Sequence, residues 1–223
     1  ERFSTVMRMF RRDFIAAGAM ALFGTAPVLA QQGRKAAARA PVILVVGDSL
    51  SAEYGLPRGS GWVALLEKRL AQEKIGATVV NASVSGDTTA GGRARLPALL
   101  RQHGPTHVVI ELGANDALRG LPLTNTRDNL AWMVEQSQAA GARVLLVGMQ
   151  MPPNYGADYA RRFAALFEAV AKERKVPLVP FLLHGIADVP DSTALFQPDR
   201  IHPRAEAHPR MLDNVWPQLR KLL

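Results

Sequence analysis

The stretch VILVVGDSLS, residues 42–51, decides the fold of this chain. It begins with an uninterrupted run of Val, Ile and Leu, which is typical of a strand buried on both faces of a parallel sheet. It ends in a Gly-Asp-Ser-Leu turn, so Ser49 stands just beyond the carboxyl end of the predicted strand. Ligands of open α/β sheets bind outside that edge, and Ser49 is therefore a candidate nucleophile. Taken alone, the same serine fits a plain helix cap equally well.

From residue 41 onward, strand patterns alternate with helix patterns. Strands are predicted at 42–46, 77–81, 107–112, 143–149 and 176–180, and helices at about 61–74, 88–102, 124–140, 157–174 and 205–222. Parallel strands joined by right-handed helical crossovers form a three-layer α/β/α sandwich, so we expect an α/β protein with one domain over residues 41–223. A further short helix is predicted around 182–187, because a long loop without secondary structure is unusual in a compact domain.

Three further polar segments follow predicted strands or precede the last predicted helix. They are Ser85-Gly86-Asp87-Thr88-Thr89, Gly113-Ala114-Asn115-Asp116 and Asp199-Arg200-Ile201-His202-Pro203. With the Gly-Asp-Ser-Leu turn they are the four sequence blocks of the SGNH (GDSL) hydrolases, and the chain resembles that superfamily over about residues 41–223. The resemblance is strongest to the bacterial thioesterase I/lysophospholipase/arylesterase branch. It implies a flavodoxin-like five-stranded parallel sheet in the order 2-1-3-4-5.

The blocks supply groups that acyl transfer needs, namely a nucleophile, a base and a group that orients the base. We expect Ser49 to attack the carbonyl carbon, His202 to take and return the proton, and Asp199 to hold the imidazole ring. Because Pro203 keeps His202 out of the helical region, the Asp-x-x-His unit is predicted to be a tight loop ahead of the last helix. Taken alone, Asp199 and His202 also fit an ordinary surface turn.

The resemblance also implies an oxyanion hole, formed by the backbone N–H groups of Ser49 and Gly86 and by the side-chain amide of Asn115. Gly86 has no Cβ, so its N–H can approach a substrate oxygen closely, and Asn115 offers an uncharged donor. Asp48 and Asp116 occupy positions that usually support loops in the superfamily, and we expect no catalytic role for either. Ser49 does not stand in a Gly-x-Ser-x-Gly elbow, which disfavours the α/β-hydrolase fold.

Two positions depart from the pattern of the resemblance. Glu53 and Arg200 stand where many relatives carry glycine. The sequence gives no reason to place either side chain against a reacting atom. We expect both residues to alter the rim of the site and its preference for charged substrates.

Apolar residues follow the third and fourth predicted strands, where loops overhang the candidate site. They are Leu118, Leu121, Leu123, Met151, Pro152, Pro153 and Tyr155. An apolar groove suits an acyl chain better than a polyol. We therefore expect a serine esterase that acts on acyl esters and thioesters of the arylester, acyl-CoA or lysophospholipid type. We expect it to need neither a metal nor another cofactor. Three alternatives stay open: a sugar O-acetyl esterase, a lipid-binding protein without turnover, and a metal hydrolase that uses Asp199, His202 and His208.

The positive charge of the chain is concentrated at its amino end. The formal net charge is +8, of which residues 1–40 carry +5 and residues 41–223 carry +3. The domain has no basic stripe with interleaved aromatic residues, so we expect no nucleic-acid partner. The chain has no cysteine, which excludes disulfides and thiolate metal sites.

The first 30 residues have the pattern of a cleavable signal peptide. Basic residues precede an apolar run over residues 14–29, and Val28-Leu29-Ala30 offers small enough residues for cleavage. The pair Arg11-Arg12 also resembles a twin-arginine export signal. We therefore expect a signal peptide at 1–30, a linker at 31–40 and a periplasmic or secreted protein with no membrane span after cleavage. An uncleaved membrane anchor is the alternative.

Overall fold

A five-stranded parallel sheet forms the centre of the domain in the computed structural model, which describes residues 40–151 and 153–223. Its strands are β1 (Val42–Gly47), β2 (Thr78–Asn81), β3 (His107–Glu111), β4 (Arg143–Val147) and β5 (Leu178–Val179), in the order β2-β1-β3-β4-β5. In the sheet register, Val45 lies opposite Asn81 on one side and opposite Val109 on the other. The predicted fold class and strand order are confirmed.

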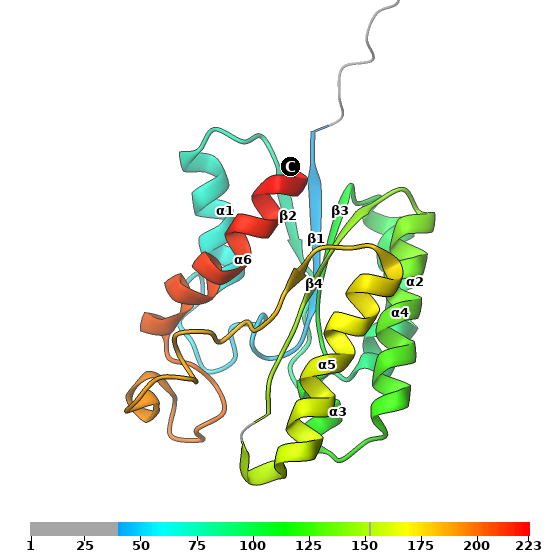
Figure 1. Cartoon of the computed structure of the whole chain (residues 1–223). Helices are drawn as coiled ribbons and strands as arrows, with labels where there is room; N and C mark the ends of the chain where they lie inside the picture. Colours follow the sequence, from blue (N-terminus) through cyan, green and yellow to red (C-terminus); the bar gives the residue numbers. More distant parts are fainter. Residues whose placement is uncertain (1–39, 152) are drawn as a thin grey trace, which may run out of the picture. The chain divides into compact units, whose positions relative to one another are not determined.

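Helices cover both faces of this sheet (Figure 1). The long helices are α1 (Trp62–Gln72), α2 (Thr89–His103), α4 (Leu123–Ala139), α5 (Ala157–Arg174) and α6 (His208–Leu222). On one face α1 packs against α6, and on the other α4 packs between α2 and α5. The short elements are α3 (Ala114–Leu118) and the 3₁₀ helices η1 (Pro153–Tyr155), η2 (Ser192–Leu195) and η3 (Ala205–Ala207). The three predicted layers are therefore present.

The middle of the sheet is the most deeply buried part of the domain. Every residue of β3, and every residue of β1 after Val42, is buried. The helices turn apolar stripes toward these strands, as with Phe163 and Phe167 of α5, whose rings meet edge to face with their centroids 5.3 Å apart. Burying each such side chain stabilises the fold by about 1.5–3 kcal/mol. This packing fixes the carboxyl ends of β1 and β3, where two segments of the site begin.

The fifth strand is shorter than the sequence predicts. The pattern indicates a strand over 176–180, but β5 comprises only Leu178 and Val179. Pro177 and Pro180 flank this pair, and a proline has no N–H to donate to a neighbouring strand. The sheet therefore ends in a short edge strand.

The predicted helix at 182–187 is wrong. This segment forms successive turns, in which the N–H of Ala187 donates to the carbonyl of Leu183 at 3.0 Å. Gly185 has a φ of +74°, which lies outside the helical region and interrupts any continuous helix. Helical structure returns only at η2.

The predicted signal peptide, residues 1–30, and the predicted linker up to residue 39 lie outside the described residues. Within the described part of the chain, no helix combines the length and the apolar character needed to span a bilayer.

Candidate active site

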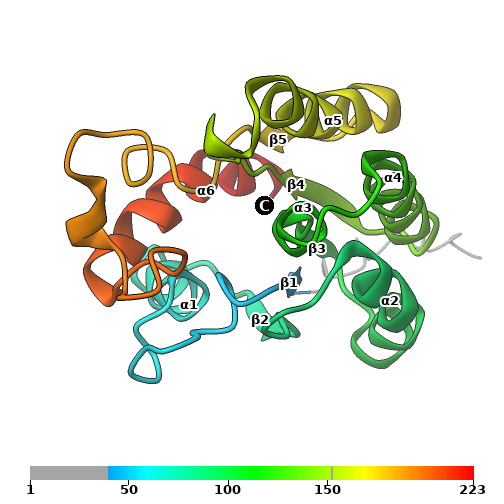
Figure 2. The same ribbon diagram turned by 90° about the horizontal axis from the view of Figure 1, so that it is seen from below.

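The four predicted blocks meet at the carboxyl edge of the sheet, the edge that faces the viewer in Figure 2. Ser49 follows β1, Gly86 lies in the loop between β2 and α2, and Asn115 is the second residue of α3. Asp199 and His202 lie in the loop that precedes η3 and α6. Residues up to 153 positions apart in the sequence are thereby brought into hydrogen-bonding distance.

Ser49, His202 and Asp199 form a continuous series of hydrogen bonds. The Oγ of Ser49 lies 2.8 Å from Nε2 of His202, and Nδ1 of His202 lies 2.7 Å from Oδ2 of Asp199. An ionised carboxylate only accepts, so the Asp199 bond places the proton of a neutral imidazole on Nδ1. Nε2 is then free to accept the hydroxyl proton of Ser49, as a general base requires.

Local hydrogen bonds hold Asp199 in its ionised form. Its second carboxylate oxygen accepts from the N–H of Ile201 at 2.9 Å and from that of His202 at 3.0 Å. Partial burial would raise the pKa of Asp199, but these backbone bonds and the His202 ring outweigh it and lower the pKa to about 2. The same bonds make the Asp-x-x-His segment the tight loop that its sequence predicts.

Two contacts fix the position of the His202 segment. The ring of Tyr54 lies against the His202 ring, with the centroids 4.4 Å apart and the planes inclined by 39°. The carbonyl of His202 accepts from the N–H of Gln197 at 2.8 Å. The imidazole is therefore oriented by its hydrogen bond to Asp199 and by contact with an aromatic ring.

Three groups are the predicted donors of the oxyanion hole: the backbone N–H groups of Ser49 and Gly86, and the side-chain amide of Asn115. In the described part of the chain, the backbone N–H groups of Ser49 and Gly86 donate to no other protein group. The Nδ2 of Asn115 donates to Oδ2 of Asp48 at 3.1 Å and to the carbonyl of Asp87 at 3.0 Å. Both amide hydrogens of Asn115 are thus engaged, and these two bonds set the direction of the side chain.

A glycine before α3 makes the position of Asn115 possible. Gly113 has a φ of +122°, and a Cβ at this position would lie 3.2 Å from the Phe167 ring. Only glycine adopts this conformation readily, and the close approach of α5 adds a second reason for it. Asp116, the next residue after Asn115, is buried and accepts from the N–H of Thr89 at 2.8 Å. Asp116 therefore links α3 to the start of α2.

A buried polar network lies beneath the nucleophile turn, and sequence reasoning did not predict it. Glu111, at the end of β3, is fully buried and accepts from the Ser51 hydroxyl at 2.7 Å and from the N–H of Asp48 at 3.4 Å. The Ser51 hydroxyl in turn accepts from Nε1 of Trp62 at 3.1 Å. Glu111 therefore contacts the chain on both sides of Ser49. The acidic residue that ends the apolar run His107–Glu111 was the available signal.

Burial raises the pKa of both carboxyl groups, Asp48 and Glu111. Burial raises the pKa of Asp48 to about 6, although bonds from Leu50 and Asn115 and the charge of His202 oppose the rise. Burial, and then the charge of Asp48, raise the pKa of Glu111 well above its ordinary value. The nucleophile turn thus rests on acids that hold their protons more tightly than exposed carboxyl groups do.

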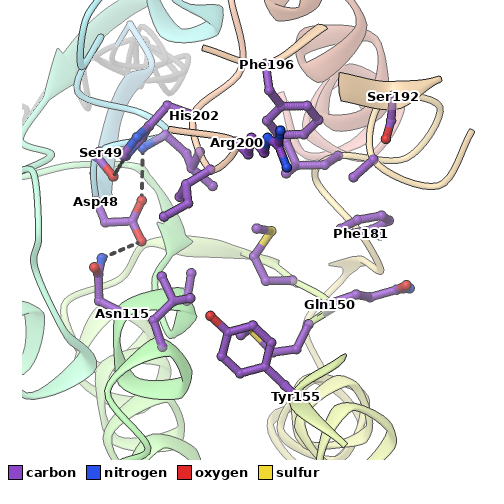
Figure 3. A pocket seen from close by; sticks show the side chains of 18 of the residues that line it. Asp48, Ser49, Asn115, Gln150, Tyr155, Phe181, Ser192, Phe196, Arg200 and His202 are labelled. Atoms are coloured by element: carbon purple, nitrogen blue, oxygen red, sulfur yellow. Dashed lines mark hydrogen bonds between the residues drawn. The ribbon is translucent and has the colours of Figure 1, made fainter. Parts of the chain in front are cut away.

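A cavity of about 510 Å³ opens beside Ser49 and His202 (Figure 3). Most of its lining is apolar, with Leu118, Met151 and Tyr155 from the predicted set, together with Leu50, Met149, Phe181, Leu183, Phe196 and Ile201. Leu121 is not among the lining residues of the described chain. Its side chain is 37% exposed, because α3 ends at Leu118 and the chain turns at Gly120 before reaching it. Leu123 packs against the core instead.

Comparison with known proteins identifies the family. The profile of the GDSL-like Lipase/Acylhydrolase family matches residues 45–210. The chain belongs to this family. The predicted resemblance and the hydrolase class are thereby confirmed.

Two relatives and one solved structure of this family of acylhydrolases are close to the chain. Esterase TesA of Pseudomonas aeruginosa is 50% identical over 212 residues, covering 95% of this chain and 100% of the relative. Thioesterase 1/protease 1/lysophospholipase L1 of Escherichia coli is 43% identical over 187 residues, covering 84% of this chain and 87% of the relative. A crystal structure of TesA superposes with a TM-score of 0.78 at 54% identity, over 82% of this chain and 99% of that chain.

Two other histidines of this acylhydrolase, His208 and His107, have structural partners. His208, which the metal-hydrolase alternative requires, is buried and accepts from the N–H of Trp62 at 3.0 Å, at the start of α1. Burial lowers the pKa of His208, in keeping with a neutral ring that accepts. His107 is bonded to the carbonyl of Leu222 at 2.8 Å. Within the described residues, no three His, Asp or Glu side chains are grouped as a metal site would need.

Proposed function

We propose that this chain hydrolyses acyl esters and thioesters through an acyl-enzyme formed on Ser49. The observation that carries the proposal is the hydrogen-bonded series from Asp199 through His202 to the Ser49 hydroxyl. The relatives named esterase and thioesterase support the same reaction class. A lipid-binding protein without turnover would have no use for this series.

In the first half of the reaction, Oγ of Ser49 attacks the carbonyl carbon while Nε2 of His202 takes its proton. Asp199, ionised at neutral pH, stabilises the imidazolium. His202 then gives the proton to the leaving oxygen or sulfur, and the acyl group stays on Ser49. In the second half, water gives a proton to His202 and attacks the acyl carbon, and Ser49 regains its proton as the acid leaves.

The oxygen of the tetrahedral intermediate would be bound by the N–H groups of Ser49 and Gly86 and by the amide of Asn115. The backbone donors need no rearrangement, since no group in the described part of the chain occupies them. Asn115 must share or exchange one of its two existing bonds, to Asp48 or to the Asp87 carbonyl. A donor that is already oriented stabilises developing charge with little reorganisation.

The apolar cavity supports a substrate with an acyl chain rather than an acetylated polyol. Each methylene that enters it is expected to gain up to about 0.8 kcal/mol, or about fourfold in kcat/KM. A series of p-nitrophenyl and CoA esters from two to sixteen carbons tests this, with activity expected to rise toward medium chains and to level off where the cavity ends. Highest activity on the acetyl ester, and higher still on acetylated sugars, would instead favour the carbohydrate esterase with the same catalytic residues.

For the amino end, we propose that residues 1–30 are an export signal and that residues 31–40 connect it to the domain. The basic and apolar pattern of the sequence supports this. The mature protein is then expected to begin near Gln31. Amino-terminal sequencing of exported protein tests the site, and an intact segment 14–30 would favour the membrane-anchor alternative.

A further inference from the structure

Two residues in the loops around the site hold a left-handed backbone conformation although they are not glycine. Glu53, in the loop after Ser49, has a φ of +59°, and Arg200, next to Asp199, has a φ of +58°. In this region the Cβ of an L-residue crowds its own backbone. A residue other than glycine at either position therefore adds backbone strain to the loop.

The Glu53 side chain forms hydrogen bonds within its own loop. Its carboxylate accepts from the N–H of Gly59 at 3.0 Å and from that of Gly61 at 2.7 Å, and so closes the loop ahead of α1. Arg200 differs. Its backbone N–H donates to the carbonyl of Gln197, but its exposed guanidinium forms no hydrogen bond or ion pair with any described residue. The strained position thus presents a cation that the fold itself does not use.

The guanidinium of Arg200 faces the substrate cavity. Arg200 lines it together with Ser49 and His202, and projects from the side that carries His202 and Phe196 (Figure 3). In the proposed reaction His202 gives its proton to the leaving group, so the leaving group lies on the His202 side of the reacting carbon. Arg200, two positions before His202 in the same loop, therefore borders the leaving group.

No acid in the cavity competes for this cation. The one carboxylate among the described lining residues is Asp48, which lies beneath the nucleophile and accepts from Leu50 and Asn115. Asp199 is engaged by His202. A guanidinium presents a planar set of donors that matches a phosphate or carboxylate group, and it stays charged at every pH of interest.

We propose that Arg200 is a specificity residue that binds an anionic group on the leaving group of the substrate, close to the scissile ester. This inference rests on the proposed hydrolysis at Ser49 and adds the class of leaving group. A phosphate a few bonds from the ester, as in a glycerophosphate monoester of a fatty acid, would lie beside the loop that carries both Arg200 and His202 into the cavity.

The test uses Arg200→Gly, which removes the guanidinium and favours the left-handed backbone already present. Two substrates differ only in the phosphate: 1-hexanoylglycerol 3-phosphate and 1-hexanoylglycerol. For the phosphate substrate, kcat/KM is expected to fall about tenfold because one hydrogen bond to a charged group is lost. The fall is expected to come from a higher KM. For the neutral substrate it is expected to stay within about twofold. Arg200→Lys should retain part of the preference, and Arg101→Ala, an exposed charge at the far end of α2, should leave it unchanged.

A second substrate pair tests whether Arg200 recognises an anion on the acyl side or on the leaving-group side of the ester. The mono-p-nitrophenyl ester of adipic acid carries its carboxylate on the acyl side, and p-nitrophenyl hexanoate is its neutral partner. If Arg200→Gly lost its preference for the adipate ester over p-nitrophenyl hexanoate, but kept its preference for the phosphate substrate over 1-hexanoylglycerol, the placement of the anion on the leaving group would be overturned. Equal losses on charged and neutral substrates, or an unchanged ratio, would overturn the role of Arg200 while leaving Ser49 chemistry intact. Absence of turnover of every ester by the wild-type protein would overturn both proposals.

Discussion

Replacing Asp48 with Asn tests how the buried carboxylate supports the oxyanion donor. Asp48 is 1% exposed. One of its oxygens accepts from the N–H of Leu50 at 3.0 Å, and the other accepts from Nδ2 of Asn115 at 3.1 Å. Asn has the same shape and keeps an acceptor for Leu50, but it turns an NH₂ group toward the amide of Asn115. The substitution removes one buried charge and one interaction without opening a cavity.

The first expected effect is on stability. The pKa of Asp48 is about 6 in the folded protein against an ordinary value of 3.8, chiefly because of burial. A rise of this size corresponds to about 3 kcal/mol, at 1.36 kcal/mol per pKa unit. Because the folded state holds the proton more tightly than the unfolded state, wild-type protein loses up to this much stability as pH rises from 4 to above 6. The amide introduced by Asp48→Asn carries no charge, so the variant does not share this loss.

The second expected effect is on catalysis. Asn115 loses the charged acceptor that, with the Asp87 carbonyl, sets the direction of its amide. A hydrogen bond to a charged group contributes about 1.5–3 kcal/mol, so kcat is expected to fall by about 10- to 100-fold with little change in KM. Relative to wild type, the variant should therefore gain stability between pH 4 and pH 8, and it should be less active at pH 8.

Urea unfolding at pH 4 and pH 8, with kcat measured at pH 8, tests both effects. The difference in unfolding free energy between variant and wild type should be up to about 3 kcal/mol more favourable to the variant at pH 8 than at pH 4. Asp128→Asn, a change at an exposed carboxylate on α4, is the control and should show no such difference. The reasoning fails if the pH dependence is the same in Asp48→Asn and wild type, or if kcat is unchanged.

Three further substitutions probe separate parts of the site. Asn115→Ala should lower kcat by about 10²–10³ with a small effect on KM, because its bond strengthens as charge develops on the oxygen; a change confined to KM would mean that Asn115 only binds substrate. Ser51→Ala should destabilise the fold by about 3 kcal/mol in thermal or urea unfolding, because Trp62 and Glu111 each lose a buried partner, and a change below about 0.5 kcal/mol would contradict the role of this network. Tyr155→Ala should flatten the rise of kcat/KM with acyl length more than it lowers acetyl-ester turnover, since the ring lines the cavity; parallel losses at all lengths would contradict an acyl-binding role.

The sequence was most informative where local pattern determines structure. The apolar run before Ser49 predicts β1, and the order of the four blocks predicts which loops meet at the sheet edge. The spacing of Asp199, His202 and Pro203 predicts a tight loop, and the backbone bonds to Asp199 agree with it. These features depend on residues close together in the chain or on the parallel topology.

Features that depend on tertiary contacts were not predicted. The bond from Ser51 to Glu111 joins residues 60 positions apart, so no local pattern indicates it. Leu121 was expected near the cavity because α3 was not predicted, and this single helical turn changes where the following loop lies. The positive φ of Arg200, on which the proposed specificity role partly rests, is likewise a property of the folded loop and has no local sequence pattern.

Covalent labelling of Ser49 tests the central claim most directly. A fluorophosphonate reacts with a serine only when a neighbouring base activates it. After trypsin digestion, mass spectrometry of the inhibited protein should show one adduct, on Ser49 in the peptide that spans residues 40–58. Ser49→Ala should carry no adduct and lose several orders of magnitude in kcat. An adduct on another residue, or turnover near the wild-type rate in Ser49→Ala, would contradict the account.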